Sequence, residues 1–270
     1  MVEDGATKRQ MGQRRMKIVV IGGTGLVGRK LVRILKGQGH EAVAASRSTG
    51  VDLVTGEGLD EVLRGAETVV DVCNLSYGDA DDLNAFFELA GSNLFEAEFL
   101  SGVSHHVTLS AVGTDRLADR GNFRAKATQE ALAAAAHVPH TIVRATPFFE
   151  FIYGIVDEGG EGDLIRLPPI RVRPIAADDV AEALAIIALG RPAHGVIELA
   201  GPEVRLLSEI AEEILVANED TRTLVIDIDA PYFGARVGDE PLVGDGGHRF
   251  ASTRFDDWLR SSLQPNFAEA

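Results

Sequence analysis

The chain has 270 residues, 45% of them hydrophobic and 25% charged, which is typical of a globular protein with a large buried core. Its net charge of −15 repels nucleic-acid phosphates and anionic lipid heads, so we expect neither direct nucleic-acid binding nor a membrane partner. A single cysteine excludes an intrachain disulfide, and the sequence has no secretory signal and no membrane-length apolar run, so a cytoplasmic location is expected.

The first predicted unit is a strand, a glycine loop and a helix. Residues 1–15 are charged and are expected to form a flexible tail. Lys17–Ile21 is a short β-branched run of the kind found in parallel strands that are buried on both faces. From Val27 onward, apolar residues recur at i, i+4, i+7 and i+8, which predicts a helix that ends near Gly37.

The same alternation continues to residue 147. Strands are predicted at 41–45, 68–72, 106–109 and 140–144, and helices at 80 to about 100 and at 123–136. Strands that alternate with helices in this way imply right-handed crossovers and a doubly wound parallel sheet. We therefore predict an α/β protein with a Rossmann domain over residues 16–147.

The pattern changes after Pro147. A Gly/Asp-rich loop precedes a proline-bounded strand at 170–174, and Asp178 and Ser208 stand where they can cap two further helices. Residues 148–270 are therefore expected to form a smaller region, interleaved with the sheet, that covers the strand ends as a lid or substrate lobe.

A glycine-rich loop stands between the first strand and the first helix. Gly22 permits a tight turn, Gly25 lets backbone N–H groups approach a pyrophosphate, and Gly28 lets the helix pack closely on the strand. The positive end of the helix then stabilises the diphosphate. The loop predicts a dinucleotide site made by Gly22, Gly23, Thr24, Gly25, Leu26, Val27 and Gly28.

The end of the second strand indicates which dinucleotide is bound. NAD-specific sites carry an acidic residue there for the ribose 2′-hydroxyl, whereas this chain has Ser46, Arg47 and Ser48. Arginine can pair with a 2′-phosphate, and both serines can donate hydrogen bonds to it. NADP(H) is therefore the expected cofactor, with NAD(H) possible.

Four further segments accompany the glycine loop: SRS at 46–48, LSAVG at 109–113, FRAK at 123–126 and RATPFF at 144–149. Together they resemble the atypical short-chain dehydrogenase/reductases, and most of all the NmrA-like NAD(P)-binding proteins. The resemblance covers the chain from Met16 to Leu259. It implies the fold and the cofactor, and it is less specific about the reaction.

The resemblance also implies roles for residues outside the glycine loop. By this likeness Cys73 and Asn74 pass beside the adenine and its ribose, and Ser110 lies near the nicotinamide. Lys126 matches the lysine that holds the nicotinamide ribose hydroxyls, and Pro147 lies where the backbone contacts the nicotinamide ring. Ser110 and Lys126 are the expected catalytic residues.

The chain departs from the family at the catalytic tyrosine. Active short-chain reductases have Tyr-x-x-x-Lys, in which the tyrosine acts as the acid and the lysine lowers its pKa. Four residues before Lys126 stands Asn122, which cannot supply a proton. Either another acid acts, or the hydride acceptor needs none in place, as with a quinone, or no chemistry occurs.

An aromatic cluster follows the fifth predicted strand, where substrate pockets of doubly wound folds open. Phe148, Phe149, Glu150 and Tyr153 are the expected pocket residues, and Glu150 and Tyr153 are the nearby groups that could replace the missing acid. The adjacent histidines 105 and 106 point to opposite faces of a strand, so we expect no metal site.

Two functions remain open at this point. The first is an NAD(P)H-dependent oxidoreductase that acts on a small apolar carbonyl or quinone, supported by Ser110, Lys126 and the aromatic cluster. The second is a non-catalytic NADP(H)-binding redox sensor of NmrA type with a protein partner, supported by the missing tyrosine. The sequence favours the oxidoreductase and does not determine the substrate or the oligomeric state.

Overall fold

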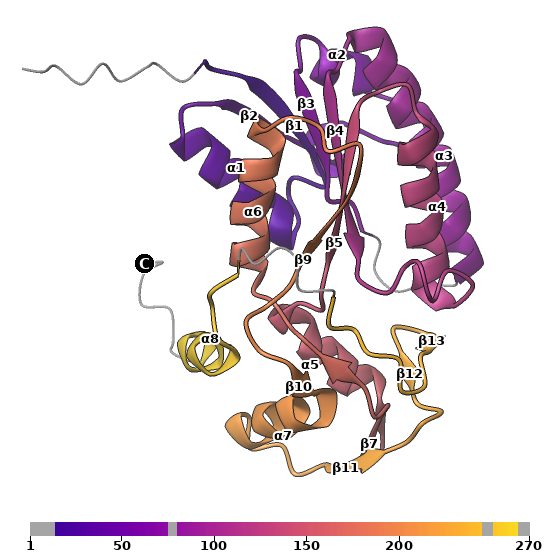
Figure 1. Ribbon diagram of the computed structural model, residues 1–270, viewed down its shortest axis with the longest axis vertical. Helices are drawn as coiled ribbons and strands as arrows, with labels where there is room; N and C mark the ends of the chain where they lie inside the picture. Colours follow the sequence, from indigo (N-terminus) through magenta and orange to yellow (C-terminus); the bar gives the residue numbers. More distant parts are fainter. Residues whose placement is uncertain (1–13, 75–79, 245–250, 264–270) are drawn as a thin grey trace, which may run out of the picture.

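The computed structural model describes residues 14–74, 80–244 and 251–263. The predicted flexible tail lies almost wholly outside the described residues. Figure 1 shows two lobes, an upper one built around a sheet and a smaller lower one.

A six-stranded parallel sheet forms the upper lobe, with the strand order β2-β1-β3-β4-β5-β9. This confirms the predicted doubly wound Rossmann fold. The chain order reverses between β1 and β3, which is the point where such sheets bind ligands. The strands are β1 (Lys17–Ile21), β2 (Glu41–Ala45), β3 (Thr68–Asp71), β4 (His105–Ala111), β5 (His140–Ala145) and β9 (Gly195–Leu199).

Helices cover both faces of this sheet (Figure 1). On one face lie α1 (Leu26–Gly37) and α6 (Ala177–Leu189), and on the other α2 (Leu59–Leu63), α3 (Ala80–Ser101) and α4 (Gly121–Ala135). Side chains alternate along β1, so Ile18 and Val20 enter one buried cluster while Val19 and Ile21 enter the other. This two-sided burial is why the strands are continuously apolar.

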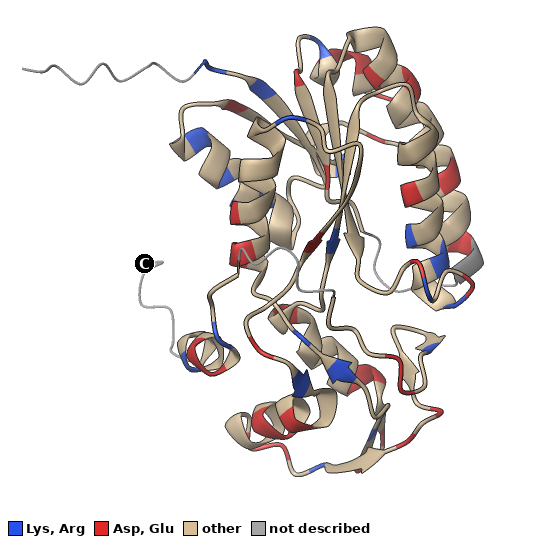
Figure 2. Cartoon of the chain, viewed as in Figure 1, with Lys and Arg blue, Asp and Glu red and all other residues tan. Residues whose placement is uncertain are grey.

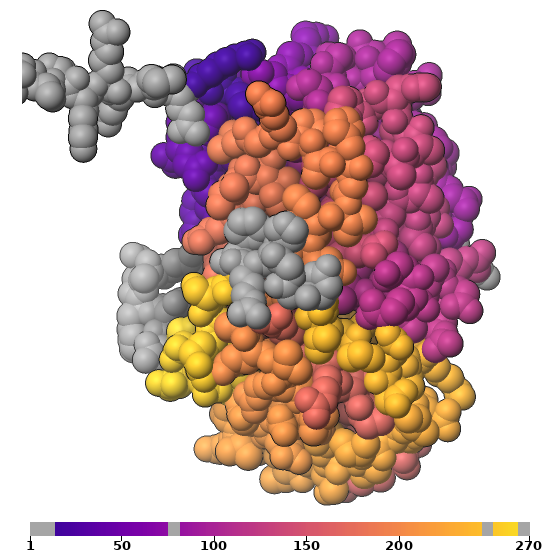
Figure 3. All heavy atoms as spheres, in the orientation of Figure 1, coloured from indigo at the N-terminus to yellow at the C-terminus, as the bar shows by residue number. Residues whose placement is uncertain are grey.

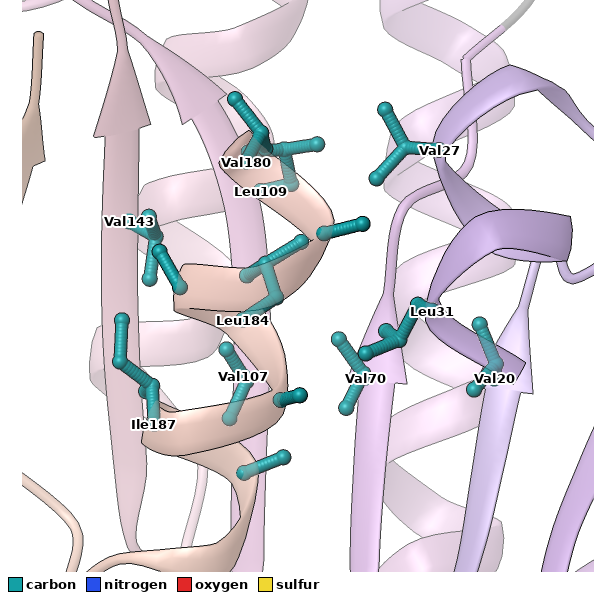
Figure 4. Packing of buried hydrophobic residues seen from close by; sticks show 14 of the residues in the cluster. Val20, Val27, Leu31, Val70, Val107, Leu109, Val143, Val180, Leu184 and Ile187 are labelled. Carbon is teal, nitrogen blue, oxygen red and sulfur yellow. The ribbon is translucent and has the colours of Figure 1, made fainter. Parts of the chain in front are cut away.

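A hydrophobic core packs α1 and α6 against one face of the sheet and so holds the N-terminus of α1 at the carboxyl ends of the strands. Figure 4 shows Leu31 of α1 facing Val20 and Val70 of the sheet, and Leu184 of α6 beside Val107. Val20 and Leu31 come from the two elements that flank the glycine loop, and all five of these side chains are fully buried. The loop is therefore held on a rigid support.

The lower lobe lies beyond the carboxyl ends of the strands (Figures 1 and 3). It has its own hydrophobic core, which includes Phe149, Ile152 and Phe255. Its helices are α5 (Phe149–Glu158), α7 (Leu207–Ala217) and α8 (Phe255–Ser262). Its strands are β6 (Gly160–Glu161), β7 (Leu164–Leu167), β8 (Arg171–Val172), β10 (Arg205–Leu206), β11 (Thr223–Ile226), β12 (Pro231–Tyr232) and β13 (Ala235–Arg236).

The lobes do not divide at residue 147. After α5 and β8 the chain returns to the upper lobe, where α6 covers the sheet and β9 adds its sixth strand. The region from 148 onward is thus interleaved with the sheet. A single short apolar run such as β9 gives no sequence signal for the sheet that it joins.

Two predicted helix caps are corrected. The N-cap of α6 is Ala176, and the Glu150 carboxylate accepts hydrogen bonds from the Ala177 N–H at 3.2 and 3.1 Å. Asp178 lies inside the first turn and pairs with Lys30. Ser208 likewise lies inside α7, whose N-cap is Leu206. In both helices a glutamate carboxylate accepts a hydrogen bond from a backbone N–H at the start of the helix, Glu150 at α6 and Glu209 at α7. The residue predicted to cap each helix is therefore not needed for that purpose.

Acidic residues are spread over the helices of both lobes, with basic residues among them (Figure 2). Among the described residues, no helix has the length and apolarity required to cross a membrane.

Candidate functional site

The glycine loop has the geometry predicted for it. Gly22 has φ +74°, and its N–H donates to the Ala45 carbonyl at 2.9 Å. Gly25 is the N-cap of α1 and offers no side-chain cap. The first-turn N–H groups of a helix have no partner within the helix. In α1 they lie at the cavity, where an anionic group can accept their hydrogen bonds.

The glycines of the loop serve two different purposes. A Cβ on Gly28 would overlap the carbonyl oxygen of Gly22, and a Cβ on Gly23 would come within 2.6 Å of the Ala44 backbone. A Cβ on Gly25 would meet only the Gly22 carbonyl oxygen, at 3.3 Å. Gly23 and Gly28 therefore permit close packing, and Gly23 does not line the cavity, whereas Gly25 leaves open space.

A cavity of about 850 Å³ runs along the carboxyl ends of the strands. Apart from Gly23, every residue predicted to bind the cofactor lines it, from the glycine loop through the end of β2 to the ends of β3, β4 and β5. The open space at Gly25 and the free N-terminus of α1 fit a pyrophosphate. The residues therefore fit a dinucleotide.

Arg47 lies on a short 3-10 turn, Arg47–Thr49, that follows β2. The turn is held by the Ser46 N–H, which donates to Thr49 Oγ1 at 2.8 Å, and by a 2.8 Å contact between the hydroxyls of Ser46 and Ser48. Arg47 is exposed and, within the described part of the chain, makes no ion pair. Its guanidinium is thus available to an anionic ligand at this edge of the cavity.

Lys126 of α4 lies in the middle of the cavity wall. Its Nζ donates to the backbone oxygens of Cys73 and Leu109 at 3.4 and 3.2 Å and to Gln129 Oε1 at 3.0 Å. Gln129 in turn donates to Asp71 Oδ2 at 2.7 Å. Burial lowers the pKa of Lys126, and the Asp71 charge opposes that shift. The three donors of the ammonium all have protein acceptors, so a ligand must share or displace one of them.

Ser110 is engaged with a charged network rather than free. Its hydroxyl donates to Glu130 Oε1 at 2.5 Å, and Arg144 donates to both oxygens of the same carboxylate at 2.9 and 2.7 Å. Arg144 also lies 3.3 Å from the Asp115 carboxylate. The Ser110 proton therefore points toward Glu130 and not toward a substrate oxygen. Sequence reasoning missed Glu130 and Arg144 because their pairing joins a helix to a strand.

Asn122 occupies the first turn of α4, one turn before Lys126, and both residues line the cavity. The position that carries the tyrosine in active short-chain reductases is therefore directed at the cavity but holds an amide. Tyr232 of β12 also lines the cavity and brings a phenol from the lower lobe. No sequence pattern around Tyr232 indicated this position.

Cys73 lines the cavity and is half-buried. Burial, and secondarily the Asp71 charge, raise the pKa of its thiol to about 12. The Asp71 carboxylate is held close because it accepts a hydrogen bond from the Cys73 N–H at 2.9 Å. At neutral pH the side chain is therefore an unreactive thiol.

This pKa predicts slow alkylation of Cys73. Because thiolate is the reactive form, we expect iodoacetamide at pH 8 to modify the folded protein roughly 10–100-fold more slowly than the urea-unfolded chain. Mass spectrometry gives both rates, since the chain has one cysteine. NADP⁺ should slow the reaction further, because Cys73 lies in the cavity. Equal rates in the folded and unfolded protein would contradict the shifted pKa.

The far end of the cavity is aromatic. The rings of Phe148 and Phe151 stack with centroids 4.9 Å apart, and Phe233 meets Phe151 edge-on at 6.2 Å. Phe86 and Phe87 of α3 lie in the same cavity wall. Of these, only Phe148 belongs to the predicted pocket.

Three predicted pocket residues lie elsewhere, and we correct their assignment. Phe149 is buried against Phe255 in the lower-lobe core, and Glu150 caps α6. The ring of Tyr153 lies beside that of Trp258, with centroids 6.3 Å apart. The reason is the helical period of α5, which turns successive residues to different sides. Glu150 and Tyr153 therefore do not replace the missing acid. The described residues also contain no cluster of three or more metal-ligating side chains.

Residues 18–110, about a third of the chain, match the model of the NAD dependent epimerase/dehydratase family. No curated protein sequence matches the chain at a significant level. The family match covers β1 to β4 and includes the glycine loop. It supports an epimerase/dehydratase-type Rossmann unit rather than a specifically NmrA-like one.

Solved structures similar in fold include MoeE5 in complex with UDP-glucose and NAD, at 20% identity and a TM-score of 0.69, covering 92% of this chain and 100% of that one. DesIV, a dTDP-glucose 4,6-dehydratase from Streptomyces venezuelae with NAD bound, has 17% identity and a TM-score of 0.70, with coverage of 92% and 96%. The Bordetella bronchiseptica enzyme WbmG in complex with NAD has 18% identity and a TM-score of 0.68, with 94% of each chain covered. At these identities the likeness shows the fold alone.

Proposed function

We propose that the chain is a nicotinamide-dependent oxidoreductase that binds NADP(H) in preference to NAD(H) and acts on a small apolar carbonyl or quinone. The observation that carries this proposal is that one continuous cavity joins the glycine loop and Arg47 to an aromatic end. NAD in complexes of proteins with the same fold supports the cofactor class.

The residues divide the work as follows. The loop around Gly25 and the N-terminus of α1 hold the pyrophosphate, and Arg47 pairs with a 2′-phosphate. Lys126 donates to the ribose hydroxyls through an N–H that it now gives to a protein oxygen. When bound, the reduced nicotinamide supplies a hydride. The aromatic end excludes water and stacks on a flat acceptor.

The lining favours an apolar acceptor over a sugar nucleotide, which is bound as UDP-glucose in the MoeE5 structure and is the substrate class in the name of DesIV. A sugar nucleotide carries a second diphosphate, which needs its own cationic side chains or its own helix N-terminus. The described cavity residues from Phe148 onward are Phe148, Phe151, Tyr232, Phe233 and Leu242, none of which is charged.

The proposal is tested by incubating the protein with NADPH and a panel of quinones, ketones and sugar nucleotides. Oxidation of the cofactor is followed by the absorbance of the reduced nicotinamide. We expect turnover with quinones above all, because their reduced form needs no positioned proton donor and the Ser110 hydroxyl is engaged with Glu130. Turnover with sugar nucleotides alone would contradict the proposed substrate class.

The NADP(H) preference predicts a selective effect of Arg47→Ala. Loss of the charge-assisted pair with the 2′-phosphate should weaken NADPH binding by about 1.5–3 kcal/mol and leave NADH binding nearly unchanged. Isothermal titration with both cofactors measures this difference. The exposed Arg33→Ala, on the outer side of α1, serves as a charge-matched control. Equal losses for NADPH and NADH would rule out the assignment of Arg47.

A second candidate function is a redox sensor of NmrA type, in which NADP(H) occupancy alters association with a protein partner. It is favoured by the engaged hydroxyl of Ser110 and by Asn122 at the tyrosine position. Tight NADPH binding without turnover across the whole panel would select the sensor over the oxidoreductase.

A further inference from the structure

Thr146 follows β5 directly and has a buried hydroxyl with no partner among the described residues. Its side chain is 1% exposed, and its backbone N–H is satisfied by the Leu199 carbonyl at 2.9 Å. Buried, unpartnered side-chain atoms also occur at His40, Glu98, His105 and Arg173 in the described part of the chain. Of the five, only Thr146 lines the cavity.

The fold gains nothing from this hydroxyl. A buried donor without an acceptor forfeits its hydrogen bonds to water, and such groups are rare in native structures unless a ligand or a functional role explains them. Valine has nearly the same shape and would avoid the penalty. Thr146 therefore brings a hydroxyl donor without an acceptor to the wall of the cavity.

We infer that Thr146 is a ligand-binding residue whose hydroxyl donates a hydrogen bond to a carbonyl oxygen held in the cavity. Two other side-chain donors of the cavity wall are already engaged, since Ser110 donates to Glu130 and Lys126 to three protein oxygens. The Thr146 hydroxyl has no such acceptor among the described residues and is available to a carbonyl oxygen that enters the cavity. The inference rests on the proposed function, which supplies two such oxygens, the nicotinamide carboxamide and the acceptor carbonyl.

Thermal unfolding of the ligand-free protein tests the first half of the inference. Thr146→Val removes the unpartnered hydroxyl and should raise Tm by roughly 2–5 °C. The matched control is Thr141→Val on β5, the strand that Thr146 follows, because the Thr141 hydroxyl accepts from the Ala193 N–H and contacts His105 Nε2, both at 2.9 Å. This control should lower Tm. A Thr146→Val protein that is less stable than the wild type would overturn the inference.

Titrations then distinguish the two oxygens. If Thr146 binds the carboxamide, Thr146→Val should weaken NADPH roughly 3–10-fold and leave 2′-phospho-ADP-ribose, which lacks nicotinamide, unchanged. If it binds the acceptor, NADPH affinity stays constant and the KM of the best quinone rises by a similar factor. Thr146→Ser, which keeps the hydroxyl, should restore wild-type behaviour in either case.

These experiments distinguish a failure of the proposed function from a failure of the role inferred for Thr146. Wild-type protein that binds neither NADPH nor 2′-phospho-ADP-ribose refutes the proposed function, and this inference with it. Wild-type protein that binds both, with Thr146→Val unchanged in NADPH affinity and in KM, refutes the role of Thr146 alone. An equal loss for NADPH and the nicotinamide-free fragment would also refute it, because the effect would then be a general distortion of the site.

Discussion

Gly25→Val is expected to weaken NADPH and NADH at least ~100-fold while the protein remains folded. Gly25 has φ −78°, which any residue adopts, and its Cβ would contact only one carbonyl oxygen. The branched side chain would therefore occupy the space over the N-terminus of α1, where the pyrophosphate would lie. Fluorescence titration with each cofactor and circular dichroism measure binding and folding separately.

Two other glycines on the same segment provide the controls. Gly37→Val, at the end of α1 with open space around it, should leave binding unchanged. Gly28→Val should lose binding together with stability, because its Cβ would overlap the Gly22 carbonyl oxygen. Unchanged cofactor affinity in a folded Gly25→Val protein would mean that the loop is only a turn.

Asn122→Tyr is expected to raise the rate of ketone reduction by roughly 10²–10⁴-fold, the effect of a positioned general acid. Asn122 and Lys126 lie one helical turn apart and both line the cavity, so the new phenol would stand beside the ammonium. The positive charge of Lys126 should lower the pKa of that phenol and favour proton donation to the substrate oxygen. Steady-state rates with a ketone panel at saturating NADPH measure the gain.

The gain must depend on the hydroxyl and on Lys126. Asn122→Phe has the same ring without the acid and should show no gain, and Lys126→Ala should abolish the gain of Asn122→Tyr. Quinone reduction should change little, because quinones accept hydride without a positioned phenol. If Asn122→Tyr binds NADPH normally yet reduces no ketone, the idea of a lost acid is wrong and the sensor becomes the better proposal.

The sequence alone determined the Rossmann half and its glycine loop. The predicted bounds of Lys17–Ile21 and Glu41–Ala45 are those of β1 and β2, and Gly22 has the positive φ that its position in the turn requires. These features are local. A strand buried on both faces must be apolar throughout, and a tight turn beside a phosphate site excludes side chains, so the residue types reveal them directly.

The aromatic end of the cavity was decided by the tertiary structure. Phe148 and Phe149 are neighbours in the chain, yet one lines the cavity and the other packs in the lower-lobe core. Which of the two rings faces the cavity depends on where α5 begins. That point is fixed by hydrogen bonds to the segment before α6 and at its start, and by the packing of Phe149 against α8. The clustering of aromatic residues showed that a pocket was near and could not show which rings form it.

The hydrogen-bond partners of the polar groups were likewise hidden from the sequence. Ser110 matches a family serine by position, but its hydroxyl donates a hydrogen bond to Glu130. Thr146 stands out only because its hydroxyl has no such acceptor among the described residues. Residue type fixes what a side chain can donate or accept. Whether that capacity is used depends on atoms brought from other strands and helices, so the chemistry left free for a ligand emerges only once the chain has folded.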